Sequence, residues 1–119
     1  DTVITAKAPR LSVPLAVLIG PQNSSATFQF ASLVRASGLG ILVGETTGGN
    51  RRGINGGAFF FARLPDSGIE FDVPLIGYFP RKPQPDAGVD PDVRVYNTAA
   101  DIAAGQDRVL ATARARLLS

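Results

Sequence analysis

The fold of this chain is decided by residues 14–43, PLAVLIGPQNSSATFQFASLVRASGLGILV. The apolar run over 14–20 ends in Gly-Pro and predicts a strand buried on both faces, as in a parallel sheet. Residues 25–37 carry apolar side chains at helical spacing, and Gly38 predicts the end of that helix. Residues 39–43 predict a second buried strand. We therefore expect an α/β fold built on a strand-helix-strand unit with a right-handed crossover.

The predicted helix has a wide apolar face. Phe28, Ala31 and Val34 recur along it at helical spacing, and Phe30 and Leu33 extend the face by half a turn.

The remainder of the chain predicts loops, a hairpin and a final helix. A glycine-rich loop covers 44–57, and β-prone runs at 58–64 and 69–73 flank the turn Pro65-Asp-Ser-Gly68, which predicts a β-hairpin. The proline-rich segment 74–91 is expected to be an extended connector. Two elements complete the chain, a short edge strand over 92–96 and a helix over 106–118 whose apolar face carries Val109, Leu110, Ala113 and Leu117.

Composition excludes several classes of function. The chain has no cysteine and no histidine, which rules out a thiol nucleophile, a disulfide, structural zinc and any Ser-His pair within it. A net charge of +2 from scattered residues argues against nucleic acid as a partner. The longest apolar run is too short to span a membrane. Asp86, Asp90 and Asp92 lack the glycine and glutamate of a calcium loop, so we expect no metal and no cofactor. Asp90 and Asp92 flank Pro91 and are interpreted as structural turn residues.

The 119 residues also predict a domain organisation. Because no methionine occurs, we expect Asp1 to follow a cut, a processing event or a chosen boundary, with an upstream part of the same protein missing. We interpret 1–119 as one domain or part of one, with 1–13 as a linker or edge segment.

Ser25 is the candidate nucleophile. It lies at the start of the predicted helix, directly after a buried strand, where free N–H groups can stabilise an oxyanion. The ordinary alternative is that Ser25 merely caps the helix, as Asn23 and Ser24 also could.

Four sequence elements together resemble the tail-specific (C-terminal processing) serine peptidases of family S41. In order along the chain they are Asn23-Ser-Ser-Ala-Thr-Phe28, Gly44-Glu-Thr-Thr-Gly-Gly-Asn50, Leu64-Pro-Asp-Ser-Gly68 and Gly88-Val-Asp-Pro-Asp-Val93. The resemblance covers about residues 14 to 118. It implies that the chain is the C-terminal part of a catalytic core with a layered α/β fold like that of crotonase and ClpP.

The resemblance also implies site residues. It makes Ser25 the nucleophile and the Ala26 N–H an oxyanion donor. The branch with a Ser-Lys dyad has its lysine where this chain has Asn50, so the chain is closer to the tricorn-like branch, whose histidine base lies far upstream of the serine. That branch has a carboxylate before the Gly-Val-x-Pro-Asp element, and the candidate here is Asp86, displaced by about one residue.

We therefore expect a serine endopeptidase fragment that is inactive by itself, acts on peptide or protein substrates, and lies outside the bacterial cytoplasm, in the periplasm or secreted. Assembly as a homo-oligomer stays open. Two alternatives also stay open: a non-catalytic peptide-binding module that has lost its base, and a crotonase-like enzyme acting on acyl thioesters.

Overall fold

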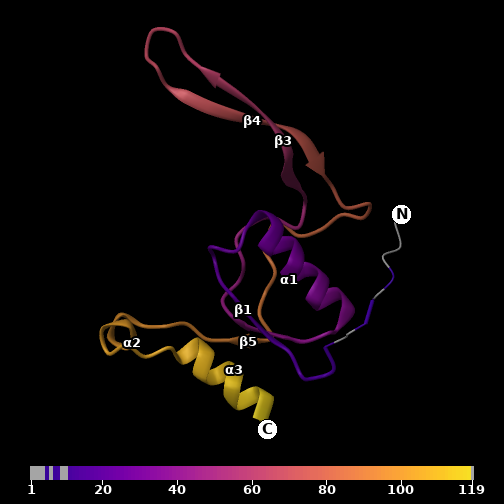
Figure 1. Cartoon of the computed structure of the whole chain (residues 1–119), viewed down its shortest axis with the longest axis vertical. Coiled ribbons are helices and arrows are strands. Elements are labelled where there is room, and N and C mark those ends of the chain that lie inside the picture. Colours follow the sequence, from indigo (N-terminus) through magenta and orange to yellow (C-terminus); the bar gives the residue numbers. More distant parts are fainter. Residues whose placement is uncertain (1–4, 6, 9–10, 119) are drawn as a thin grey trace.

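The computed structural model describes residues 5, 7–8 and 11–118, so most of the predicted linker over 1–13 lies outside the described residues. Figure 1 shows the arrangement of the helices and strands. In chain order these are β1 (Ala16–Ile19), α1 (Ser25–Ser37), β2 (Ile41–Gly44), β3 (Ile54–Arg63), β4 (Glu70–Tyr78), β5 (Val93–Arg94), α2 (Ala99–Ala103) and α3 (Arg108–Leu118).

The predicted strand-helix-strand unit is confirmed. β1 and β2 run parallel, with Ala16 opposite Ile41, and β5 joins the other side of β2 in parallel. α1 and α3 both contact this three-stranded sheet. The hydrophobic core on the α1 side of the sheet is formed by Ile19, Phe28, Ala31, Val34, Leu42 and Val89, with Val17 and Ile54 partly buried against it.

α1 has the predicted bounds but a narrower buried face. It ends at Gly38, whose φ of 63° lets its N–H donate to the carbonyl oxygen of Arg35. Phe28, Ala31 and Val34 are buried, whereas Phe30 and Leu33 remain 54% and 68% exposed, so only part of the wide apolar face is covered. The same holds for β1, where Leu18 faces partly outward. The core is therefore thinner than the apolar pattern suggests.

The hairpin is longer than predicted. β3 pairs with β4 in antiparallel register from Ile54 opposite Tyr78 to Arg63 opposite Glu70. The expected connector therefore starts after Tyr78, because Pro74 lies within β4, opposite Phe59. A two-stranded sheet has two edges, so proline costs no hydrogen bond when its missing N–H faces outward.

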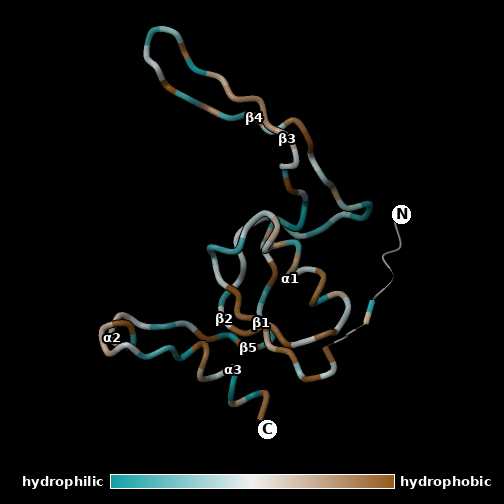
Figure 2. Tube along the Cα trace, in the orientation of Figure 1, coloured by the Kyte–Doolittle hydropathy of each residue, from teal (hydrophilic) through white to brown (hydrophobic). Residues whose placement is uncertain are grey.

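The hairpin projects from the rest of the molecule, and the tube in Figure 2 shows many apolar residues along it. The radius of gyration is 18.2 Å, against about 13–14 Å for a compact domain of this length. The accessible surface is 9056 Å², against roughly 6,000 Å² for a compact monomer of this mass. The chain therefore leaves much more surface exposed than a compact domain does, and large apolar side chains of the hairpin such as Phe61 and Leu75 are part of it.

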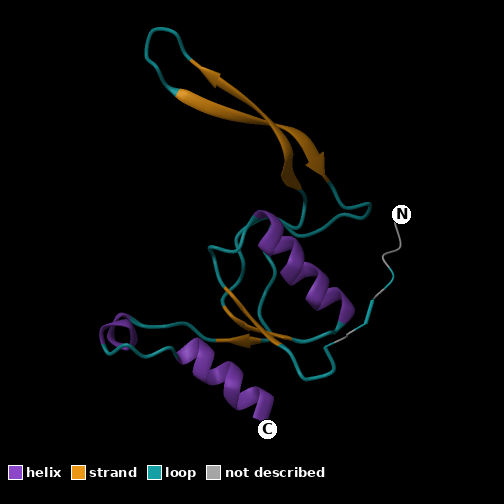
Figure 3. Cartoon of the chain, viewed as in Figure 1, coloured by secondary structure: helices purple, strands orange, loops and turns teal. Residues whose placement is uncertain are grey.

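The C-terminal part holds one helix that the sequence analysis missed. In α2, the Thr98 side chain accepts from the Asp101 N–H, and the Asp101 carboxylate accepts from the Thr98 N–H. This reciprocal pair is a capping box, and its two residues, three positions apart, were visible in the sequence. α3 starts at Arg108, two residues later than expected, and buries Ala113. Figure 3 shows it as the last helix of the chain. Across the described residues, no helix combines the length and apolar content needed to cross a membrane.

Candidate functional site

A tight turn connects β1 to α1 and carries the candidate nucleophile. The Asn23 N–H donates to the carbonyl oxygen of Gly20 over 2.9 Å, and the Gly20 N–H donates to the Asn23 side-chain oxygen over 2.7 Å. These two bonds close the chain on itself just before the helix. Asn23 therefore holds the turn, and Ser25 follows it as the first residue of α1.

Ser25 has a strained backbone. Its φ is +53°, and among the described residues the other positive φ values all belong to glycines. A left-handed conformation in a non-glycine residue costs on the order of 1–3 kcal/mol and concentrates at functional sites. In α/β-hydrolases the nucleophilic serine is presented on a strained strand-to-helix turn. The conformation places an exposed hydroxyl at the end of the helix.

The amide groups at this helix end are available for an anion. The helical bonds begin at the N–H groups of Thr27 and Phe28, which donate to the carbonyl oxygen of Ser24 over 3.2 and 3.4 Å. The amides of Ser25 and Ala26 precede these bonds and point out of the helix end. Ser24 has extended backbone angles, and its side chain makes no capping bond. Ser24 and Ser25 thus differ in conformation although they are neighbours.

The glycine-rich loop packs directly against the Ser25 turn. A Cβ on Gly48 would lie 2.3 Å from the carbonyl oxygen of Pro21, and one on Gly49 would lie 2.8 Å from the Phe28 ring. Neither contact leaves room for a side chain. The loop therefore supports the turn and fixes the start of α1.

Two of the resembling elements are bonded to each other. The Thr47 hydroxyl accepts from the Val89 N–H over 2.8 Å, and the Thr47 N–H donates to the Val89 carbonyl oxygen over 3.0 Å. Next to them, the Thr46 hydroxyl donates to the Asp90 carboxylate over 2.7 Å. This hydrogen bond, together with the nearby Arg94 guanidinium, lowers the pKa of Asp90 below its usual value. The distant Gly-Glu-Thr-Thr-Gly-Gly and Gly-Val-Asp-Pro-Asp elements thus form one structural unit.

Ser25 opens onto a cleft of about 490 Å³ between α1 and the base of the hairpin. Its lining is uncharged and comprises Ser25, Ala26, Gln29, Ile54, Asn55, Gly56, Gly57 and Tyr78. No carboxylate, amine or imidazole is among these described lining residues. The cleft therefore holds Ser25 and Ala26, with no side chain able to act as a general base among its described lining residues.

Asp86 lies in a different cluster from Ser25. Its carboxylate accepts from the Asn50 side-chain amide and from the Arg52 guanidinium, the latter over 2.9 Å. The Asn50 side-chain oxygen in turn accepts from the Arg52 N–H. The structure thus brings Ser25 and Ala26 together but leaves Asp86 outside the cleft, and a catalytic role for Asp86 stays a prediction.

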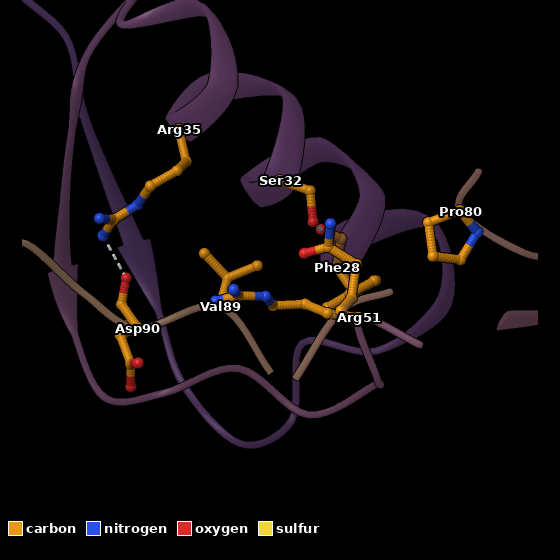
Figure 4. Close-up of a pocket in the computed structure, with 8 residues that line it drawn as sticks. Phe28, Ser32, Arg35, Arg51, Pro80, Val89 and Asp90 are labelled. Atoms are coloured by element: carbon orange, nitrogen blue, oxygen red, sulfur yellow. Dashed lines mark hydrogen bonds between the residues drawn. The ribbon is translucent and has the colours of Figure 1, made fainter. Parts of the chain in front are cut away.

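A second pocket, of about 450 Å³, is lined by other residues of α1, among them Phe28, Ser32 and Arg35 (Figure 4). There Arg35 donates to the main-chain carbonyl oxygen of Asp90 and forms a 3.2 Å ion pair with Asp92. Asp92 also accepts from the Leu42 N–H over 2.7 Å. Asp90 and Asp92 therefore tie the Gly-Val-Asp-Pro-Asp element to α1 and β2, in agreement with their prediction as structural residues.

Comparison with known proteins identifies the class of this fold. A crystal structure of a "putative peptidase" from Parabacteroides merdae superposes on it with a TM-score of 0.60 and 26% sequence identity. The match covers 92% of this chain and 33% of the other, so the chain spans about a third of that protein's length. The model of peptidase family S41 matches residues 2–95. The chain belongs to peptidase family S41. None of the curated proteins matches it.

Membership in this family implies the α/β peptidase fold that the sequence analysis expected. The sequence analysis missed the far wall of the cleft, which is formed by residues 54–57 and Tyr78. The Gly56-Gly57 step inside a strand was the available signal, because glycine in a strand often marks a bulge or a close approach.

Proposed function

We propose that this chain is the nucleophile-bearing part of a serine endopeptidase catalytic domain, similar to the tricorn-like branch of the tail-specific peptidases. The observation that carries the proposal is the positive φ of Ser25 at the mouth of an open cleft. A strained backbone conformation persists only where the surrounding structure enforces it, and residues of this kind cluster at active sites.

In this mechanism the Ser25 Oγ attacks the scissile carbonyl carbon and passes its proton to a general base. The oxyanion that forms is stabilised by the Ala26 N–H at the helix end. The peptide C–N bond then breaks as the base returns the proton to the leaving amine, which leaves an acyl group on Ser25. Water activated by the same base hydrolyses this ester and frees the enzyme.

The base comes from an upstream part of the same protein, and we expect a histidine. The uncharged lining of the cleft supports this source, as does Asn50, which occupies the dyad lysine's position and bonds Asp86. The exposed apolar hairpin supports the presence of an upstream partner that covers it. We also propose that the protein acts outside the cytoplasm, on peptide or protein substrates.

The test uses the intact protein and matched serine variants. Ser25→Ala should lower kcat/KM for peptide hydrolysis by at least ~10³-fold. Ser24→Ala is the control and should change it far less, because the Ser24 side chain makes no capping bond. A fluorophosphonate probe followed by peptide mass mapping should place its adduct on Ser25. An adduct on Ser24, or full activity in Ser25→Ala, contradicts the assignment.

The proposal also predicts the pH dependence and the state of the isolated chain. With a histidine base, kcat/KM of the intact protein should fall as pH drops through roughly 6 to 7, where imidazole charges. The 119-residue chain should be silent, since a positioned base contributes ~10²–10⁴-fold. Lys82→Ala should leave activity unchanged, because exposed Lys82 is not among the cleft residues.

A second candidate function is a non-catalytic peptide-binding module. The same uncharged cleft favours it, because the described residues around Ser25 include no base. An intact protein that binds peptides but shows neither hydrolysis nor probe labelling would support this alternative.

A further inference from the structure

Gly56 differs from every other glycine of the chain. All thirteen glycines lie within the described residues, and twelve have either a positive φ or an atom within 4 Å of the position that a Cβ would occupy. Gly56 has neither, so neither backbone conformation nor packing requires glycine there. Glycine in a strand interior costs roughly 0.5–1 kcal/mol relative to alanine. Its presence therefore calls for a reason outside the contacts of this chain.

The position of Gly56 supplies that reason. Gly56 pairs with Ile76 and Ile54 pairs with Tyr78, so by strand alternation all four side-chain positions share one face of the hairpin base. Ile54, Gly56 and Tyr78 also line the cleft beside Ser25. A side chain at residue 56 would thus extend from this face into the cleft.

The strand is also distorted next to Gly56. The register shifts between Gly56 and Phe59, and Gly57 has a φ of 82°. Such a bulge redirects a strand, and bulges recur beside active sites. A Cβ on Gly57 would have Ile76 Cδ1 and the Tyr78 hydroxyl as its nearest side-chain neighbours, both at 3.4 Å. The Tyr78 side chain therefore extends along the bulge and forms a wall of the cleft next to the open space at Gly56.

We propose that Gly56 sets the size of the substrate side chain bound beside Ser25, with Tyr78 as the adjacent wall. The ligand is a peptide whose residue adjoining the scissile bond has a bulky, uncharged side chain. The uncharged lining supports this chemistry, because it offers no ion-pair partner to a charged substrate side chain. This inference rests on the proposed function, since it assigns a subsite to the same serine.

The experiment measures kcat/KM of the intact protein on two peptide series, one varied on the acyl side of the scissile bond and one on the amine side. Each series carries alanine, phenylalanine or lysine at the varied position. In one of the series the unmodified protein should cleave the phenylalanine peptide at least about 10-fold better than the lysine peptide, a range typical of pocket discrimination.

Gly56→Val fills the open space with a residue suited to a strand. It should lower kcat/KM for that phenylalanine peptide by about 10-fold or more, and for the alanine peptide by less than about 3-fold. Labelling of Ser25 by a small fluorophosphonate should persist. Ala62→Val, the same kind of enlargement further along β3 and outside the cleft lining, is the matched control and should preserve the preference.

The outcomes separate the two proposals. If the unmodified protein shows neither labelling nor hydrolysis, the proposed function fails and this subsite falls with it. If the protein is active but Gly56→Val leaves both series unchanged, the subsite assignment is overturned and the function stands. Equal loss on all peptides together with lost labelling also overturns it, because residue 56 then contacts another part of the protein instead of the substrate.

Discussion

The parallel unit (β1, α1, β2 and β5) and the hairpin (β3 and β4) contain similar apolar residues, which are buried in the parallel unit and exposed in the hairpin. In the parallel unit, Leu42 and Val43 are fully buried between α1 and α3. In the hairpin, Phe61 and Leu75 are 74% and 64% exposed, although they also lie in regular strands. A sheet is stabilised by burying at least one face. Within the described residues, no other element covers a face of the hairpin. The comparison shows that regular backbone pairing and burial are separate conditions.

The register makes this contrast sharper. The pairs Phe60 with Val73 and Ala62 with Phe71 share one face of the hairpin, which by strand alternation also includes Leu75. These positions are all apolar. The opposite face carries Phe59 and Phe61, whose rings stack with centroids 6.2 Å apart, but also Arg63, Asp72 and Glu70 towards the tip. The first face therefore has the all-apolar pattern of strands whose face is buried against another part of a protein.

The largest expected effect compares one leucine from each region. Leu42→Ala should lower the free energy of unfolding of this chain by about 2–5 kcal/mol, because it leaves a cavity in the core. Leu75→Ala should change it by less than about 0.5 kcal/mol, as is usual for exposed positions. Urea unfolding followed by circular dichroism measures both. Similar losses at the two positions would mean that the hairpin is already packed in solution.

The same pair in the intact protein tests what covers the hairpin. Leu75→Ala should become clearly more destabilising there than in the 119-residue chain, while the effect of Leu42→Ala should stay the same. An unchanged effect at Leu75 would contradict the proposal that an upstream part of the protein covers this face.

A smaller effect is expected at the hydrogen bond between Thr47 and Val89, which joins the Gly-Glu-Thr-Thr-Gly-Gly and Gly-Val-Asp-Pro-Asp elements. Thr47→Val keeps the shape but leaves the Val89 N–H unpaired, so it should cost about 1–3 kcal/mol in urea unfolding. Thr47→Ser retains the hydroxyl and is the control. If the valine and serine variants are equally stable, the hydroxyl is not what holds the two elements together.

The smallest effect concerns acid. The pKa of Asp90 is lowered first by the Thr46 hydrogen bond and then by Arg94. A folded-state pKa below the unfolded value gives stability that is present above about pH 4 and is lost as pH falls through the folded pKa. Asp90→Asn should therefore lose less stability than the unmodified chain between about pH 5 and pH 2. Urea unfolding midpoints of both proteins at each pH measure the difference. Identical losses of stability would show that Asp90 does not contribute to destabilisation by acid.

Much of the parallel unit could be predicted from the sequence because its signals are local. The run before Gly20, the spacing of Phe28, Ala31 and Val34, and the terminal Gly38 each act over a few residues. The candidate nucleophile came from the same local pattern and from the resemblance. The apolar spacing did not show that Phe30 and Leu33 stay exposed, because burial depends on which surfaces meet and not on spacing.

By itself the sequence determined the parallel strands, the bounds of α1, the place of Ser25 at its start, and the absence of a histidine base within the chain. The tertiary structure decided the positive φ of Ser25, the bonding of Thr47 to Val89 across forty-two positions, and the cleft that joins Ser25 to Gly56 and Tyr78. The physical reason is the distance along the chain over which each kind of interaction acts. Propensity, capping and periodicity act within a few residues of chain, whereas strain and clefts arise where distant segments pack against one another.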